Sequence, residues 1–132
     1  MAEAIVFSMP VRPEPWSVVD LFSGAGGMSY GFHAHPAFAV VGAADAQIGK
    51  PSSGRGTLGC NETYFANIGV SPIAADLGTV DPDDLFESMG LARPGVTVLC
   101  ACPPCTGFSR TSPQNHIRDD SRNGLVGTFR LS

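Results

Sequence analysis

Three of the four cysteines fall within six residues, and one of them is placed to act as a nucleophile. Cys105 directly follows Pro103 and Pro104, whose rings restrict the backbone and so fix the direction of the thiol. A thiol held just past a buried strand is a nucleophile when its pKa is lowered, and otherwise it is a small buried apolar side chain. Cys100 and Cys102 lie in or beside the apolar run, where the second interpretation suits them better.

A zinc site is the rival interpretation of the same cysteines. Cys100, Cys102 and Cys105 have C-x-C-x-x-C spacing, with Cys60 or a histidine as the candidate fourth ligand. The set starts on a predicted strand and lacks an obvious fourth ligand, so we predict no metal. Disulfides are not expected, because the chain shows no secretory signal and is predicted to be cytoplasmic.

Glycines concentrate in a second segment, residues 20–27, with the sequence DLFSGAGG. Gly24 and Gly26 allow a sharp turn and a close approach of the backbone to a ligand, because no Cβ stands in the way. The spacing matches the dinucleotide fingerprint poorly, and no Lys-Ser/Thr pair follows, which excludes a phosphate-binding P-loop. A plain strand-to-helix turn is the alternative.

Two aspartates follow apolar runs at the ends of predicted strands. Asp45 lies 19 residues after Gly26, where a carboxylate can accept hydrogen bonds from both ribose hydroxyls of an adenosine ligand. Asp76 follows the next run, where a carboxylate can accept a hydrogen bond from an adenine amino group. For both residues the alternative is a helix N-cap or a solvated acid.

These residues are positioned by apolar runs that alternate with amphipathic segments. Strands are predicted at 16–21, 38–44, 71–75 (weakly) and 95–101, and helices at 28–33, 61–67, 82–90 and from near Ser121. The third helix has a typical start, with Asp81 as N-cap and Pro82 in the first turn. Buried strands alternating with helices indicate a parallel sheet covered on both faces, whose ligands bind beyond the carboxyl ends of the strands.

Composition excludes several classes of protein. The 132 residues are 43% apolar and 15% charged, which suits one domain with a core, and no apolar run approaches the ~20 residues that span a bilayer. The formal net charge is −4, but residues 107–132 carry four arginines against two aspartates. A basic segment on an acidic body fits one edge that faces an anion, although scattered surface charge produces the same count.

Two segments together resemble the C5-cytosine DNA methyltransferases. DLFSGAGG at 20–27 is similar to that family's methyl-donor motif, and PPCTGFS at 103–109 is similar to its Pro-Cys catalytic motif. The resemblance covers residues 16–132. It implies an α/β fold, the Rossmann-like fold of S-adenosylmethionine-dependent methyltransferases, with a mostly parallel and incomplete sheet of about four strands. Residues 1–15 are expected to form an N-terminal arm, and 16–132 part of the catalytic domain.

The resemblance implies S-adenosylmethionine as the methyl donor and S-adenosylhomocysteine as the product. Phe22 is expected to pack on the adenine, and Asp76 to accept a hydrogen bond from its amino group. Asp45, where many relatives have glutamate, is expected to hold the ribose hydroxyls. The other expected donor contacts are Gly24, Ala25, Gly26, Gly27, Leu77 and Pro104.

The resemblance also implies a reaction on DNA. Cys105 is the expected nucleophile, adding to C6 of a cytosine that has left the duplex. The Pro103 carbonyl is expected to face the cytosine amino group, and Ser109 and Arg110 to contact phosphates. The implied partner is double-stranded DNA with a flipped cytosine. The implied setting is bacterial restriction-modification, in the cytoplasm and associated with the nucleoid.

The chain also departs from the family pattern. Thr106 stands where the family usually has glutamine, and no Glu-Asn-Val segment, Gln-x-Arg-x-Arg segment or target-recognition region follows. We therefore expect part of an enzyme, inactive alone, whose missing C-terminal half is a candidate partner as a separate chain. The alternatives are a tRNA cytosine-C5 methyltransferase and a non-catalytic donor-binding fragment or half of a split enzyme. In the tRNA branch Gln-Pro-Phe-Thr typically follows the cysteine, whereas here TGFS favours DNA.

Overall fold

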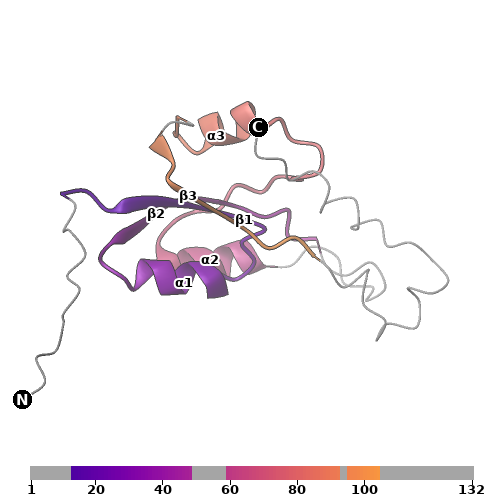
Figure 1. The fold of residues 1–132 in the computed structure, drawn as a ribbon. Helices are drawn as coiled ribbons and strands as arrows, with labels where there is room; N and C mark the ends of the chain where they lie inside the picture. The colour runs from indigo at the N-terminus through magenta and orange to yellow at the C-terminus, as the bar shows by residue number, and fades with distance from the viewer. Residues whose placement is uncertain (1–12, 49–58, 93–94, 105–132) are drawn as a thin grey trace, which may run out of the picture.

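The computed structural model describes residues 13–48, 59–92 and 95–104. They form a parallel sheet with helices on both faces, which confirms the predicted α/β fold class (Figure 1). In chain order the elements are β1 (Trp16–Leu21), α1 (Gly27–His33), β2 (Phe38–Ala44), α2 (Cys60–Ile68), α3 (Pro82–Ser88) and β3 (Val98–Ala101).

Strand β1 is the centre of the sheet, whose order is β2-β1-β3. It pairs in parallel with β2 from Trp16 opposite Phe38, and with β3 from Val18 opposite Val98. The bounds of β1 and β2 are those that the sequence predicted, because each is a short run of mostly apolar residues. The predicted last strand is shorter than expected, since only Val98–Ala101 of residues 95–101 join the sheet.

The prediction of a weak strand at 71–75 was wrong. In the described residues this segment makes only one isolated bridge, between Ile73 and Ala44, so the sheet has three strands there and not about four. The Ile73 amide donates to Ala43 over 2.9 Å, and the Ile73 carbonyl accepts from Asp45 over 3.1 Å. Pro72 has no amide to donate, and the alanines after Ile73 have low strand propensity, so the pairing does not extend.

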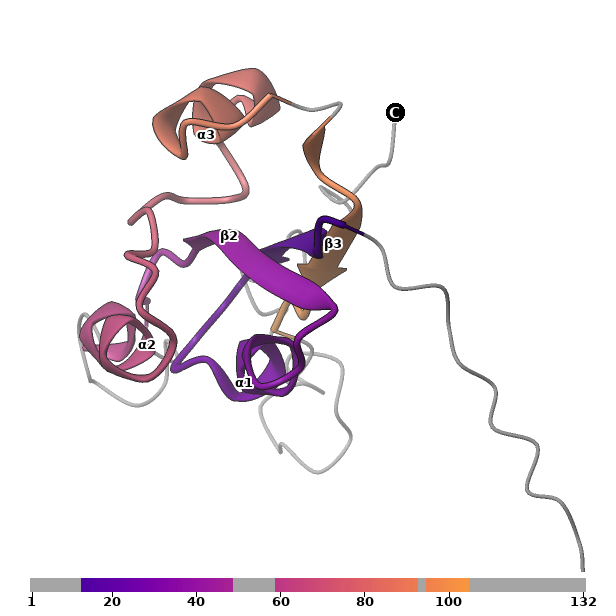
Figure 2. The same cartoon turned by 90° about the vertical axis from the view of Figure 1, so that its left-hand side faces the viewer.

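The helices lie in two layers, with α1 and α2 on one face of the sheet and α3 on the other (Figures 1 and 2). Helix α3 begins as predicted: Asp81 caps it by accepting from the amides of Asp83 at 2.9 Å and Asp84 at 3.2 Å, and Pro82 follows. Helices α1 and α2 begin one residue earlier than predicted, and α2 ends at Gly69, whose φ of 83° is left-handed.

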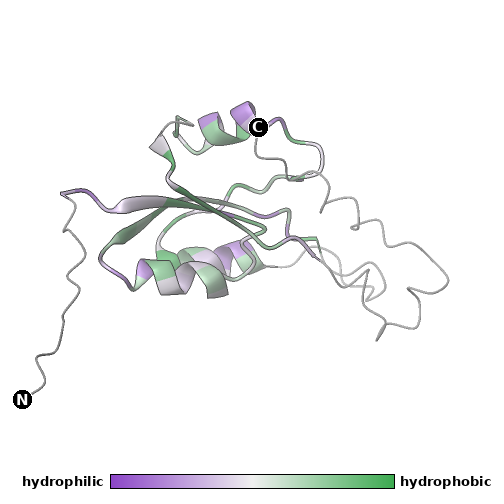
Figure 3. Ribbon diagram, in the orientation of Figure 1, coloured by the Kyte–Doolittle hydropathy of each residue, from purple (hydrophilic) through white to green (hydrophobic). Residues whose placement is uncertain are grey.

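Each face of the sheet has its own core cluster. Val19, Leu21 and Leu85 are buried between β1 and α3, whereas Tyr64 and Ile68 of α2 are buried with Ala43 on the other face. Hydropathy follows this division, with apolar residues lining the strands and the inner sides of the helices (Figure 3). Among the described helices, none is long and apolar enough to cross a membrane. The helix predicted from Ser121 lies outside the described residues.

Candidate functional site

The carboxyl ends of all three strands meet at one edge of the sheet. Past β1, the Ser23 amide donates to the carbonyl of Ala44 at the end of β2 over 3.2 Å. Past β3, the Cys102 amide donates to the Leu21 carbonyl over 3.4 Å and leads the chain to the two prolines. The predicted site residues that are described therefore gather at this edge, as expected for a parallel sheet.

The glycine turn, residues 22–27, owes its shape to three left-handed residues. Phe22 has φ 58°, Gly24 φ 54° and Gly26 φ 97°. A Cβ added at Gly26 would lie 3.0 Å from Cδ2 of Tyr64, so this position needs glycine for space as well as for conformation. A Cβ at Gly24 would meet nothing described within 4 Å, so the backbone there is open to approach by a ligand.

Asp45 ties the end of β2 to this turn. Its Oδ2 accepts the Gly24 amide at 2.9 Å, and its Oδ1 accepts the Gln47 amide at 2.6 Å. The Cys60 thiol, from the start of α2, lies 3.7 Å from the same Oδ1. A carboxylate has about four acceptor positions, so most of those of Asp45 are used within the chain and few remain for a ligand.

Backbone strain is concentrated at the same edge. Among the described residues, Phe22 and Gln47 are the two non-glycine residues with left-handed φ, at 58° and 57°. Phe22 precedes Ser23 in the glycine turn. The side-chain oxygen of Gln47 accepts a hydrogen bond from the Asn61 amide at 3.0 Å. Such conformations cost about 1–3 kcal/mol each and gather at functional sites. The strain therefore marks the same edge at one residue inside the DLFSGAGG motif and at one outside it.

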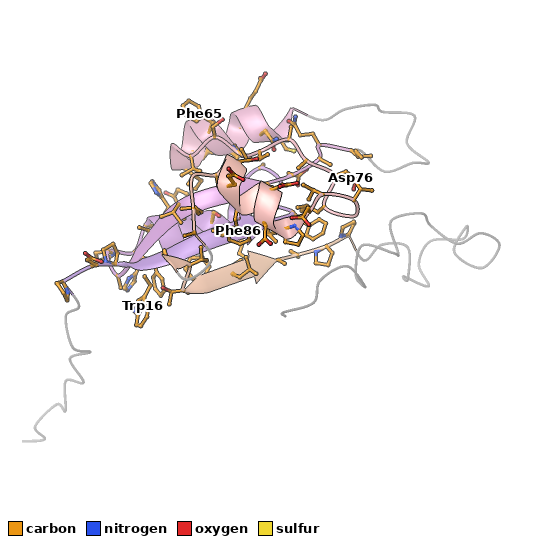
Figure 4. The ribbon with its side chains drawn as sticks, turned by 90° about the horizontal axis from the view of Figure 1, so that it is seen from above. Trp16, Phe65, Asp76 and Phe86 are labelled. Atoms are coloured by element: carbon orange, nitrogen blue, oxygen red, sulfur yellow. The ribbon has the colours of Figure 1, made fainter. Side chains whose placement is uncertain are left out.

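Asp76 and Leu77 reach the site by a different route. The bridge at Ile73 carries the chain past the end of β2, and Asp76 is exposed, with Oδ1 accepting the Gly78 amide at 2.9 Å. Figure 4 shows Asp76 at the opposite end of the sheet from Trp16, which is the end where the strands finish. Leu77 packs, like Phe22, against the core cluster of Val19 and Leu21. No hydrogen bond joins Asp76 to Asp45 among the described contacts, so the two acids lie at one edge but are not directly paired.

Ser23 is a candidate that the sequence prediction missed. It is 7% exposed, and its Oγ is buried with no hydrogen-bond partner among the described residues. Leaving such a group unpaired costs about 1–3 kcal/mol, so an unpaired hydroxyl inside the glycine turn is suited to a ligand. A serine beside a glycine is typical of any turn. The one sequence signal that could have marked Ser23 as a site residue is its position between Phe22 and Gly24.

Two of the described cysteines, Cys60 and Cys100, lie where a thiolate is disfavoured. Burial, and then the negative charge of Asp45, raise the pKa of Cys60, while burial and Asp20 raise the pKa of Cys100. Neither environment favours a thiolate nucleophile.

No group of three potential metal ligands occurs among the described residues. The predicted site residues Cys105, Ser109 and Arg110 lie outside the described residues. Pro103 and Pro104, both half-buried, are the last described residues before Cys105.

Comparison with known proteins places this site in a family. The family model of the C-5 cytosine-specific DNA methylases matches residues 16–130. The chain belongs to this family. That confirms the membership that the two motifs predicted, and the methylase model spans both the glycine turn and Cys105.

Individual methyltransferases support the same assignment. The chain is 34% identical over 114 residues to the type II methyltransferase M.DdeI of Desulfomicrobium norvegicum, and 34% identical over 108 residues to M.AgeI of Thalassovita gelatinovora. These matches cover 86% and 81% of the chain but 23% and 22% of the two relatives. The crystal structure of the S. pombe Dnmt2 methyltransferase is similar with a TM-score of 0.50 and 26% identity, over 84% of this chain and 30% of that one. The methylase chain thus spans about a quarter of its curated relatives' length.

Proposed function

We propose that this methylase chain holds the donor-binding and nucleophile-bearing part of a DNA cytosine-C5 methyltransferase. The observation that carries the proposal is the bond between the Gly24 amide and Asp45, which joins the glycine turn to the end of β2 in a chain of this family. The turn also carries the Ser23 hydroxyl, which has no hydrogen-bond partner among the described residues. Together they provide an open backbone, a carboxylate and an unused hydroxyl at the edge where α/β sheets bind ligands.

The residues at this edge fit S-adenosylmethionine. Phe22, half-buried at the end of β1, would pack on the adenine, and Asp45 would accept from the ribose with its remaining capacity. Asp76 would accept from the adenine amino group, with Leu77 beside the ring, and Pro104 would line the donor pocket. Ser23 Oγ and the backbone of Gly24, Ala25, Gly26 and Gly27 would face the amino-acid part of the donor.

Cys105 would supply the nucleophile. Its thiolate would add to C6 of cytosine, which would make C5 electron-rich enough to attack the methyl group of S-adenosylmethionine, with S-adenosylhomocysteine as the leaving group. The C5 proton then leaves, the bond between sulfur and C6 breaks, and the thiolate is released. Burial raises the pKa of the Cys100 thiol, which makes Cys100 a weaker candidate and supports the proposal that the cysteine beyond the prolines has this role.

The DNA partner follows from the same chemistry. C5 and C6 lie inside the base stack, so the target cytosine must be flipped out, at a cost of a few kcal/mol. Pro103 would face the cytosine amino group, and Ser109 and Arg110 would contact phosphates. The remaining parts of such a reaction, including target recognition, would come from further sequence or from a separate C-terminal chain. DNA as substrate would associate the protein with the nucleoid of a bacterial cytoplasm.

The covalent step is tested with DNA that contains 5-fluorocytosine, which cannot lose its C5 substituent and traps the adduct. The complete polypeptide of the reading frame, with S-adenosylmethionine, should give a complex that resists denaturation. Cys105→Ser should abolish it, because an alcohol is far less ionised than a thiol near neutral pH. Cys100→Ser and Cys102→Ser are the matched controls and should retain it. An adduct that survives Cys105→Ser would reject the assignment, and RNA trapped in place of DNA would favour the tRNA alternative.

A further inference from the structure

A buried chain of hydroxyl groups runs behind the glycine turn and connects three elements. The Tyr64 hydroxyl in α2 lies 2.6 Å from Ser29 Oγ in α1, and the Ser29 hydroxyl donates to Asp20 Oδ2 in β1 over 2.6 Å. Tyr64 is 0%, Ser29 1% and Asp20 2% exposed. Helices α1 and α2 lie on the same face of the sheet, so the chain of hydroxyl groups crosses the interior of that layer (Figure 2).

The hydrogen bonds of this chain have one direction. Ser29 has a single hydroxyl proton and gives it to the Asp20 carboxylate, so its oxygen is left to accept from Tyr64. Burial raises the pKa of Tyr64 to about 12, so the phenol keeps its proton and can donate it. The three groups are therefore ordered as donor, relay and acceptor, and each bond polarises the next.

The ring of Tyr64 makes a second contact with the turn. Cδ2 lies 3.0 Å, and Cε2 3.4 Å, from the position of a Cβ at Gly26, and Ile68 of the same helix is 3.3 Å from it. Gly26 is the N-cap of α1, and its carbonyl accepts the Tyr30 amide at 2.9 Å. The ring thus limits movement of the turn toward α2, while the hydroxyl fixes Ser29 and Asp20 on either side of the turn.

A core alone does not need these polar groups. Phenylalanine has nearly the volume of tyrosine, and on the opposite face of the sheet Val19, Leu21 and Leu85 pack together through apolar side chains. Buried polar groups cost free energy unless they are bonded, and a fully bonded set selects one arrangement of the elements that it joins. Because this set ends at Asp20, at the entry to the glycine turn, the arrangement that it selects is that of the turn.

We propose that Tyr64 is a positioning residue for the methyl donor. Its hydroxyl, through Ser29 and Asp20, and its ring, against Gly26, hold the glycine turn in the conformation that binds the donor. This inference rests on the proposed function, because it adds helix α2 to the residues that form the same site. It assigns Tyr64 an action through the turn and not a contact with the reacting atoms.

The test compares Tyr64→Phe with Tyr30→Phe in the complete polypeptide. Tyr64→Phe removes the hydroxyl and keeps the ring, while Tyr30, which is 60% exposed on α1, is the matched control. Tyr64→Phe should raise the KM and Kd for S-adenosylmethionine about threefold to tenfold, the range for loss of one intramolecular hydrogen bond. It should leave kcat at saturating donor and the KM for DNA unchanged. Tyr30→Phe should change none of these constants.

Ser29→Ala interrupts the same chain and provides a second variant. The donor KM of Ser29→Ala should also rise. The double variant with Tyr64→Phe should have a donor KM no higher than that of the single variant with the higher KM. A lower kcat at unchanged donor KM would make Tyr64 purely structural and overturn the proposal, as would a wild-type donor KM in both variants. A wild-type protein that binds no donor would reject the proposed function and this inference together. If the wild-type protein binds the donor and both variants bind it equally well, this inference alone is rejected.

Discussion

On the α3 side of the sheet, Val19 and Leu21 of β1 pack with Leu85 in a cluster whose buried members are all apolar. On the α1 and α2 side, the same strand presents Asp20, bonded to Ser29 and through it to Tyr64. Apolar packing tolerates small changes of position, whereas hydrogen bonds weaken steeply when their geometry changes. The α3 face therefore contributes mainly stability, while the opposite face sets the geometry of the glycine turn.

The largest expected effect separates these two roles. Leu85→Ala, at a position 3% exposed, should lower the free energy of unfolding by about 2–5 kcal/mol through lost burial and a cavity. Donor affinity per folded molecule should stay at the wild-type value. Urea unfolding and calorimetric titration of the same preparation measure the two quantities. A clear loss of donor affinity in the folded fraction would show that both faces shape the site.

A glycine substitution on the other face should affect both quantities. Gly26→Ala places a Cβ 3.0 Å from the Tyr64 ring at φ 97°, and should cost about 1–3 kcal/mol of stability and weaken donor binding. Gly31→Ala in α1 is the matched control, because a Cβ there meets nothing described within 4 Å. It should stabilise the helix by about 0.5–1 kcal/mol and leave donor binding unchanged. Equal changes in stability and donor affinity for the two variants would show that the turn is not held against α2.

The smallest effect is a pH dependence confined to the polar face. Burial, and to a lesser degree Asp45, raise the pKa of Asp20 above its ordinary 3.8, although the Ser29 bond lowers it. The native state therefore holds this proton more tightly than the unfolded state. The resulting stabilisation is complete below the unfolded pKa and is lost as pH rises through the raised pKa.

Asp20→Asn should remove this dependence. Relative to the variant, the wild-type protein should lose stability as pH rises from about 3.5 toward neutral, as measured by urea unfolding across that range. Asp84→Asn, an exposed acid on α3, controls for the change in net charge. Parallel stability curves for wild type and Asp20→Asn would show that the Asp20 proton is not linked to folding.

Local patterns predicted much of the fold. Strands β1 and β2 were predicted to the residue because a short, mostly apolar run is sufficient to mark a strand that is buried on both faces. The start of α3 was predicted because the cap of Asp81 depends only on residues that follow it directly. The strand predicted around Ile73 failed because sheet pairing depends on the partner strand, and Pro72 offers it no amide.

The contacts that build the site join residues far apart in sequence, and the sequence could not predict them. Asp45 was placed at the end of a strand, but its bonds to the Gly24 amide and the Cys60 thiol arise only when β2, the turn and α2 come together. Tyr64 lies in the helix predicted at 61–67, and nothing in that segment of the sequence marked its hydroxyl. Its hydroxyl acquires a partner only because Ser29 lies opposite it in the folded chain.

The edge around the glycine turn is where we propose that the methyl donor binds. Calorimetric titration of the complete polypeptide with S-adenosylhomocysteine tests it most directly, comparing Asp45→Ala with Asp84→Ala, an exposed acid on the opposite face that controls for charge. Asp45→Ala loses charged hydrogen bonds and its hold on the Gly24 amide, and should weaken binding by about 1–3 kcal/mol, or roughly fivefold to 150-fold in Kd. Asp84→Ala should bind as wild type does. Equal dissociation constants for the two variants and the wild-type protein would contradict the account.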